Sequence, residues 1–205
     1  MDDYEDFINM VSQRYSPHLK HYIVWNEVAS AGWMDCSPHT PNRAGPNGEN
    51  PLTDAQFDYW VSKYAELVKR TAAALKRHSP GYMIWTSNDR LWERPNQADG
   101  EPLHTGVRPF LDRLWPKLGV KEFNWSLAVH PYDRGNPMDD SEFAEGYHPK
   151  AYTFATLSHV VEYQKSQVTA AGLDPTSNAG KPFSWLYVDN LETIVCTQDS
   201  FPVRD

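Results

Sequence analysis

The feature that most constrains this chain is a regular alternation between short apolar runs and longer amphipathic segments. The apolar runs cover residues 22–25, 82–85 and 125–129, and in none of them do polar and apolar side chains alternate. Such continuous runs are typical of strands buried on both faces, as in parallel sheets. Amphipathic periodicity predicts helices over residues 2–15, 54–78, 107–118 and 154–171. The order α-β-α-β-α-β-α predicts an α/β fold with parallel strands and flanking helices.

Local signals support several of these helices. Thr53 and Gln56 form a capping-box pattern before the second helix, and Leu52 and Phe57 fit the hydrophobic staple that often accompanies it. The expected apolar face of that helix is Phe57, Trp60, Val61, Tyr64, Leu67, Val68, Thr71 and Leu75. The first helix is expected to bury Tyr4, Phe7, Ile8, Val11 and Tyr15, and the last to bury Phe154, Leu157, Val161 and Val168 before ending at Gly172.

Each apolar run is followed by polar residues at its carboxyl end. These candidate site residues are Asn26 and Glu27 after the first run, Asn88 and Asp89 after the second, and His130 and Tyr132 after the third. In parallel α/β folds, ligands bind at the carboxyl ends of the strands. We therefore expect these side chains to lie at one mouth of the sheet. The alternative is structural: Glu27 is then an exposed carboxylate that closes a strand, and the others are hydrogen-bonded or core residues.

Composition narrows the range of partners. The 205-residue chain has a formal net charge of −8, which disfavours binding to phosphate backbones, so no nucleic-acid partner is expected. No apolar run approaches the length of a membrane span, so no membrane partner is expected. The acidic N-terminus is unlike a signal peptide. Localisation stays open, because a longer parent protein could be secreted. No metal-ligand spacing or phosphate loop is evident, and neither cofactor nor metal is expected. Whether Cys36 and Cys196 pair is not decided by the sequence.

Residues 22–27, Tyr-Ile-Val-Trp-Asn-Glu, resemble the fourth-strand motif of clan A glycoside hydrolases, which fold as (β/α)-barrels. Residues 128–132, Ala-Val-His-Pro-Tyr, resemble the sixth strand of a poorly characterised glycosidase-like family of the same kind. The resemblance covers about residues 2–171. It implies that Glu27 is the general acid/base, that Asn26 binds a sugar 2-hydroxyl, and that His130 and Tyr132 contact the sugar or orient the nucleophile. Trp25 and Trp85 are candidates for stacking on sugar rings, with a core position as the alternative.

The chain departs from the clan pattern after residue 180. A further strand is expected over residues 183–188, but Asp189-Asn190 stands where the clan has its nucleophilic Glu, and Glu192 follows too late. One helix precedes the first strand where three strands are expected. We therefore predict a single incomplete domain over residues 1–205, a partial TIM-type barrel with strands equivalent to the fourth to sixth and perhaps the seventh. Residues 197–205 are expected to be an irregular tail. A natural fragment, a faulty gene model and a decayed copy are all compatible with this pattern.

The leading functional hypothesis is a retaining O-glycosidase, or a fragment of one, that acts on an oligosaccharide or polysaccharide. Glu27 is its acid/base, and its nucleophile is missing or displaced. The alternative is a non-catalytic carbohydrate-binding or degenerate barrel protein. An unrelated α/β hydrolase is disfavoured because no Gly-x-Ser-x-Gly elbow occurs. The chain alone is expected to hydrolyse aryl glycosides poorly or not at all, because both steps of a retaining reaction need the nucleophile.

Overall fold

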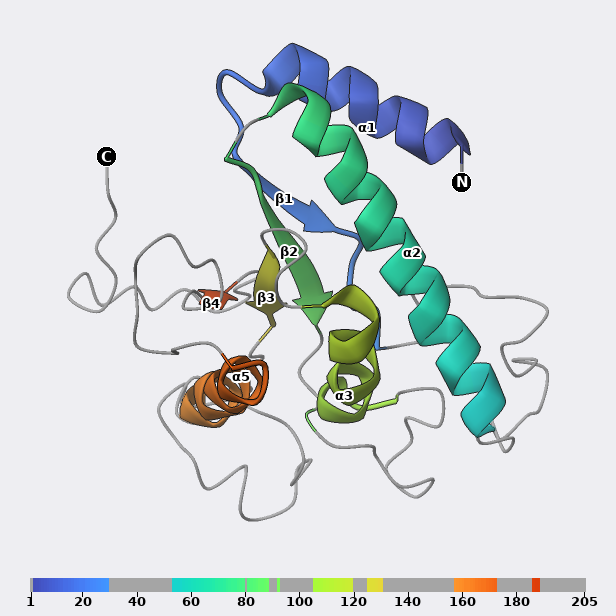
Figure 1. The fold of residues 1–205 in the computed structure, drawn as a ribbon, viewed down its shortest axis with the longest axis vertical. Coiled ribbons are helices and arrows are strands. Elements are labelled where there is room, and N and C mark those ends of the chain that lie inside the picture. Colours follow the sequence, from blue (N-terminus) through green and yellow to red (C-terminus); the bar gives the residue numbers. More distant parts are fainter. Residues whose placement is uncertain are drawn as a thin grey trace.

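The computed structural model describes residues 2–29, 53–79, 81–88, 92, 105–119, 125–130, 157–172 and 186–188. Its elements follow the order α1 (Asp2–Tyr15), β1 (His21–Val24), α2 (Asp54–His78), β2 (Met83–Asn88), α3 (Val107–Leu118), β3 (Trp125–Val129), α5 (Leu157–Ala170) and β4 (Leu186–Val188) (Figure 1). Helices and strands alternate along the chain. The expectation of a mixed α/β fold with parallel strands is therefore confirmed.

The four strands form one parallel sheet in the order β1-β2-β3-β4. Tyr22 pairs with Ile84, and Thr86 in turn pairs with Leu127. Along the sheet, each strand neighbours the strand that follows it in sequence. Within the described residues β1 and β4 are the two ends of this order, so the described part of the sheet is open.

Helix α2 forms as its sequence predicts. The Thr53 hydroxyl accepts a hydrogen bond from the Gln56 backbone N–H at 3.2 Å, and the Thr53 backbone N–H donates to Gln56 Oε1 at 2.9 Å. This reciprocal arrangement confirms the capping box. All eight residues of the expected apolar face of α2 are buried. Leu52, the expected staple partner, lies outside the described residues.

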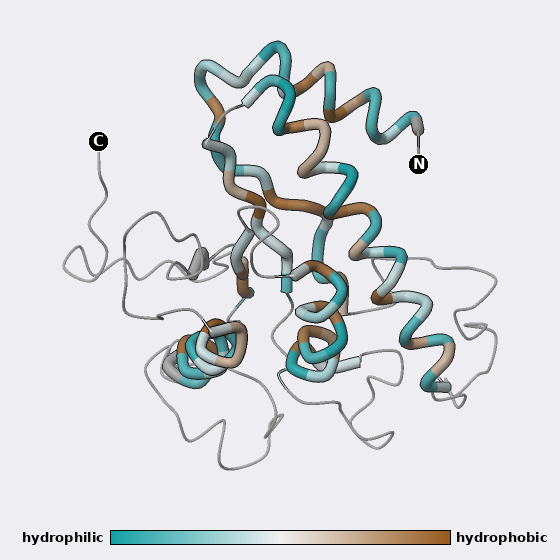
Figure 2. The backbone as a smooth tube through the Cα atoms, in the orientation of Figure 1, coloured by the Kyte–Doolittle hydropathy of each residue, from teal (hydrophilic) through white to brown (hydrophobic). Residues whose placement is uncertain are grey.

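The core fills the space between the sheet and the helices that follow β1 and β2. Phe110 of α3 lies at its centre, with its ring centroid 6.1 Å from that of Trp60 and 5.8 Å from that of Tyr64, both in α2. The ring of Trp125 in β3 lies 4.4 Å from that of Trp115 in α3. Figure 2 shows hydrophobic and hydrophilic stretches alternating along the helices, as amphipathic helices require. These aromatic side chains are therefore core residues.

Two expected helix faces are wrong in part. Phe7 and Tyr15 of α1 are 53% and 43% exposed, whereas Ile8 and Ser12 are buried. Helix α1 is thus rotated about its axis relative to the expected orientation. Polar contacts explain this rotation, because Arg77 of α2 donates to both Glu5 and Asn9 and draws that side of α1 onto α2. Helices α1 and α2 accordingly run side by side (Figure 1).

On α5, the buried residues are Val160, Gln164 and Val168, and Val161 is only partly buried. Gln164 lies on this face because its Nε2 donates to the Ser126 hydroxyl at 3.0 Å. Gly172 has φ 70° and follows the helix as the sequence predicts. Phe154 lies outside the described residues, as do residues 183–185 of the expected last strand.

Candidate functional site

The carboxyl ends of β1, β2 and β3 meet at one edge of the sheet, because all three strands are parallel and adjacent. Glu27 comes from the turn after β1, and His130 follows β3 directly. A hydrogen bond joins Glu27 Oε1 and His130 Nδ1 at 2.9 Å, across 103 positions in sequence. The structure therefore brings together the two residues that the sequence placed at equivalent strand ends.

Both members of this pair are buried. The side chain of Glu27 is 9% exposed and that of His130 is 1% exposed. His130 is also fixed by its backbone, since its N–H donates to the Asn88 carbonyl at 3.1 Å and extends the pairing of β2 with β3. A buried carboxyl and an imidazole in hydrogen-bond contact can share and pass one proton. The pair thus has the composition of a general acid/base centre. It also excludes the reading of Glu27 as an exposed strand-closing carboxylate.

The backbone around Glu27 is unusual. Trp25 has φ 66° and Glu27 has φ 43°, in the left-handed region that side-chain-bearing residues avoid. The Glu27 N–H donates to Ser87 Oγ at 3.1 Å, and the Val28 N–H approaches the Ser87 carbonyl at 3.4 Å. Left-handed residues persist where their surroundings hold them, and they concentrate at functional sites. The conformation therefore adds to the case that residues 25–27 are functional.

Further buried hydroxyls hold the same turn. The Tyr64 hydroxyl of α2 donates to the Val24 carbonyl at 2.9 Å. Burial raises the pKa of Tyr64, and a smaller opposing effect comes from a hydrogen bond to the Ser87 backbone. The Ala29 carbonyl accepts from Thr105 twice, from its N–H at 2.9 Å and from its hydroxyl at 3.1 Å. The turn after β1 is thus tied to β2, to α2 and to the segment before α3.

Asn88 has a different role from Glu27. Its Nδ2 donates to the carbonyls of Thr86 at 2.6 Å and Ala128 at 2.9 Å, so it ties β2 to β3. Successive side chains of a strand point to opposite faces, and Ser87 points to the Glu27 side. Asn88 therefore faces away from the carboxyl–imidazole pair. Its Oδ1 is buried, and the described residues offer it no donor.

The two candidate stacking residues differ in exposure. Trp25 is 48% exposed and lies two residues before Glu27 in the sequence. Trp85 is buried, its Nε1 donates to His21 Nδ1 at 3.1 Å, and the two rings stack at 5.8 Å. Asn26 is partly buried. Asp89 and Tyr132 lie outside the described residues.

Sequence reasoning missed Tyr64, Ser87 and Thr105. Ser87 could have been proposed from the sequence, because it lies next to Asn88 at the polar carboxyl end of β2. Tyr64 appeared only as a member of the apolar face of α2. Its hydroxyl reaches β1 because the ring lies at the junction of β1 and β2, and no sequence pattern marks that position. Thr105 carries no local signal.

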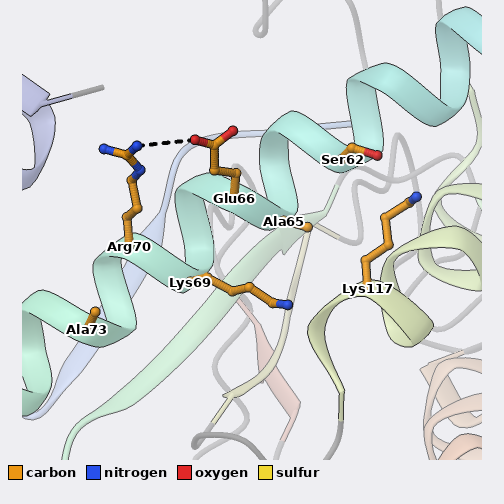
Figure 3. A pocket seen from close by; sticks show the side chains of 7 residues that line it. All are labelled: Ser62, Ala65, Glu66, Lys69, Arg70, Ala73 and Lys117. Carbon is orange, nitrogen blue, oxygen red and sulfur yellow. Dashed lines mark ion pairs between the residues drawn. The ribbon is translucent and has the colours of Figure 1, made fainter.

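A surface groove of about 520 Å³ lies along α2 beside Lys117 of α3 (Figure 3). Two of its basic side chains are already paired with carboxylates, which disfavours an anion site there. Arg70 lies 3.4 Å from Glu66, and Lys117 lies 3.0 Å from Asp58. The groove contains none of the strand-end residues.

Among the described residues, no group of three or more His, Cys, Asp or Glu side chains is arranged to hold a metal ion. In the same part of the chain, no helix is both long and apolar enough to cross a membrane. Cys36 and Cys196 lie outside the described residues. Comparison of the chain with protein-family models, with curated proteins and with solved structures finds no match.

Proposed function

We propose that the strand-end cluster is the carbohydrate site of a retaining glycoside hydrolase, or of part of one, with Glu27 as the proton donor. The observation that carries this proposal is the buried 2.9 Å contact between Glu27 Oε1 and His130 Nδ1 at the carboxyl edge of a parallel sheet. Ligands of parallel α/β folds bind at this edge. The residues present there are the types that the resemblance to clan A implies.

The strand order supports a barrel-type fold. In doubly wound sheets the order of the strands reverses at a switch point. Here the four parallel strands follow one another without reversal. With right-handed crossovers, such a sequence of strands places the connecting helices on one face, as in a (β/α)-barrel. We propose that the chain forms a partial barrel of this kind.

In this proposal Glu27 gives its proton to the glycosidic oxygen as the bond to the anomeric carbon breaks. His130 holds the carboxyl group in place through its Nδ1 and shares the proton between turnovers. Trp25 offers a half-exposed ring on which the apolar face of a sugar can stack. Asn26 is the residue next to the acid and is proposed to bind the sugar 2-hydroxyl.

A retaining reaction also needs a carboxylate about 5–5.5 Å from the acid, on the opposite face of the sugar. Asp189 and Glu192 are the candidates that the sequence offers, and both lie outside the described residues. We propose that the nucleophile is missing or displaced in this chain. The chain alone then turns over glycosides poorly or not at all.

A second candidate function is carbohydrate binding without hydrolysis. The exposure of Trp25 favours it, since stacking on a sugar needs no nucleophile. Both candidates take an oligosaccharide or polysaccharide as ligand. They differ in whether the Glu27 proton is ever transferred.

The test is turnover of a panel of aryl glycosides, with and without azide as an external nucleophile. Azide attacks the anomeric carbon, the aryl oxygen leaves with the proton of Glu27, and a glycosyl azide forms. We expect little turnover without azide and measurable turnover with it. For phenyl glycosides, whose leaving group needs a proton, Glu27→Gln should lower that turnover roughly 10²–10⁴-fold. The matched control Glu162→Gln alters an exposed carboxylate of α5 that pairs with its helical neighbour Lys165 at 2.7 Å, and it should retain turnover.

Each other outcome has a meaning. Phenyl glycoside turnover that Glu27→Gln leaves unchanged contradicts the proposal. Robust turnover without azide that Glu27→Gln abolishes shows that a nucleophile is present, and Asp189 or Glu192 is then the next residue to replace. Binding of a sugar without any turnover supports the second candidate. The absence of both sugar binding and turnover contradicts both candidate functions.

A further inference from the structure

The turn after β1 holds two residues in a conformation that their side chains disfavour. Trp25 and Glu27 have positive φ, whereas the other positive-φ residues in the described part of the chain are glycines. A side chain at such a position crowds the following carbonyl. The turn therefore does not keep this shape by its own preference, and the groups around it must hold it.

Among the hydroxyls of the described residues that contact this turn, that of Ser87 bonds Glu27 itself. Its Oγ accepts the Glu27 N–H at 3.1 Å, and its carbonyl lies 3.4 Å from the Val28 N–H. Tyr64 and Thr105 bond the flanking carbonyls of Val24 and Ala29. One serine thus contacts two successive N–H groups, one on each side of the Glu27 α-carbon.

Ser87 also sits where it can relate Glu27 to His130. It is fully buried in β2, and it pairs with Ala128 of β3, two residues before His130. The backbone of His130 is bonded to Asn88, the next residue after Ser87. The end of β2 therefore contacts both partners of the pair, through Ser87 on one side and Asn88 on the other.

We propose that Ser87 is a positioning residue, which holds Glu27 in its left-handed conformation and thereby aims the Glu27 carboxyl group at His130. Without the Ser87 hydroxyl, the Glu27 N–H is a buried donor with its partner removed, and the turn relaxes towards an ordinary conformation. The side chain of Glu27 then leaves its position next to the imidazole. The positioning itself is independent of the reaction; only its effect on turnover rests on the proposed function.

The direct readout is spectroscopic. In the intact protein the imidazole nitrogen and Nδ1-proton resonances of His130 should show a hydrogen-bonded Nδ1. Glu27→Gln identifies the signal, because it alters the partner. Ser87→Ala should shift these resonances towards those of an imidazole without that bond. The matched control is Ser126→Ala, which removes an equally buried serine hydroxyl of the neighbouring strand that bonds Gln164 instead. It should leave the His130 resonances unchanged.

The second readout is the azide-supported turnover of phenyl glycosides. Ser87→Ala should lower it roughly tenfold to a hundredfold, the scale of a small misplacement of a catalytic group. Combined with Glu27→Gln, Ser87→Ala should add no further loss, because Ser87 acts through Glu27. Losses that multiply in the double variant would show a general structural role and overturn the proposal.

The two readouts separate the two failures. Unchanged His130 resonances in Ser87→Ala overturn the positioning role, even if Glu27 proves catalytic. Shifted resonances in a protein without turnover leave Ser87 as a positioning residue and refute the glycosidase proposal alone. If Ser87→Ala does not fold, Ser87→Cys takes its place in both experiments. This substitution nearly keeps the side-chain volume and replaces the hydroxyl oxygen with sulfur, a weak acceptor. It should shift the same resonances in the same direction.

Discussion

Replacement of Tyr64 by Phe tests whether the hydroxyl under the turn after β1 stabilises the fold. The ring packs at 5.8 Å from Phe110, and Phe keeps that contact. What is lost is the hydrogen bond from the hydroxyl to the Val24 carbonyl at 2.9 Å, together with the bond between the hydroxyl and the Ser87 backbone. Leaving a buried acceptor without its donor costs about 1–3 kcal/mol. We expect the free energy of unfolding to fall by about 1–2 kcal/mol, and Tm by roughly 2–4 °C per kcal/mol.

The matched control is Tyr22→Phe. Its hydroxyl donates to the Leu19 carbonyl at 3.2 Å in an exposed position, where water can replace it. The expected cost is below about 0.5 kcal/mol. The assay is urea unfolding followed by tryptophan fluorescence, with Tm from calorimetry. Equal losses in the two variants would refute the reasoning, because the difference between them rests on burial alone.

Tyr64→Phe should also change how the stability of the protein depends on pH. Burial raises the pKa of Tyr64 above its ordinary value of 10.0, so the folded protein keeps the phenol neutral where the unfolded chain ionises it. The stabilisation is fully present below pH 10 and is lost as the pH rises further, by about 1.36 kcal/mol per pH unit for one proton. Tyr64→Phe should reduce this slope. It should not remove it, because Tyr4, Tyr82 and Tyr163 also have raised pKa values. An unchanged slope would contradict the prediction.

Three further predictions concern stability. Thr53→Ala should cost about 1 kcal/mol because it removes the cap of α2, and Thr53→Ser should restore most of that loss in the same urea titration. Phe7→Ser should change the unfolding midpoint little because Phe7 is 53% exposed, whereas Ile8→Ser on the buried side should cost several kcal/mol; similar losses would contradict the observed rotation of α1. Trp25→Gly should be more stable than Trp25→Ala by about 0.5–1 kcal/mol, since only Gly accepts φ 66° freely; the opposite order would argue against the left-handed turn.

Much of the fold could be predicted because its signals are local. The cap and buried face of α2 follow from side chains within a few positions of one another, and β3 coincides with a continuous apolar run. The side of α1 that packs could not be predicted, because Glu5 and Asn9 are drawn in by Arg77, which is 68 or more positions away. Periodicity measures apolar residues and does not register such polar contacts.

The candidate site could likewise be predicted from the sequence only in part. Glu27 and His130 could be proposed because each follows an apolar run, and adjacent parallel strands bring their carboxyl ends together. The roles of Ser87 and Tyr64 could not be proposed, because they depend on the register of β1 against β2 and on the depth at which α2 packs. The left-handed conformation of Trp25 and Glu27 was also beyond sequence reasoning, since neither residue type favours it.

The central claim is that Glu27 protonates a leaving oxygen, and the most direct measurement of it is the dependence of turnover on the leaving group. Proton donation matters for a phenyl glycoside, whose leaving group is a poor one. It matters little for a dinitrophenyl glycoside, whose leaving group departs unaided. With azide present, Glu27→Gln should lower turnover of the phenyl glycoside roughly 10²–10⁴-fold and leave the dinitrophenyl glycoside nearly unchanged. Equal losses for the two substrates, or no azide-supported turnover of either by the unaltered chain, would contradict the account.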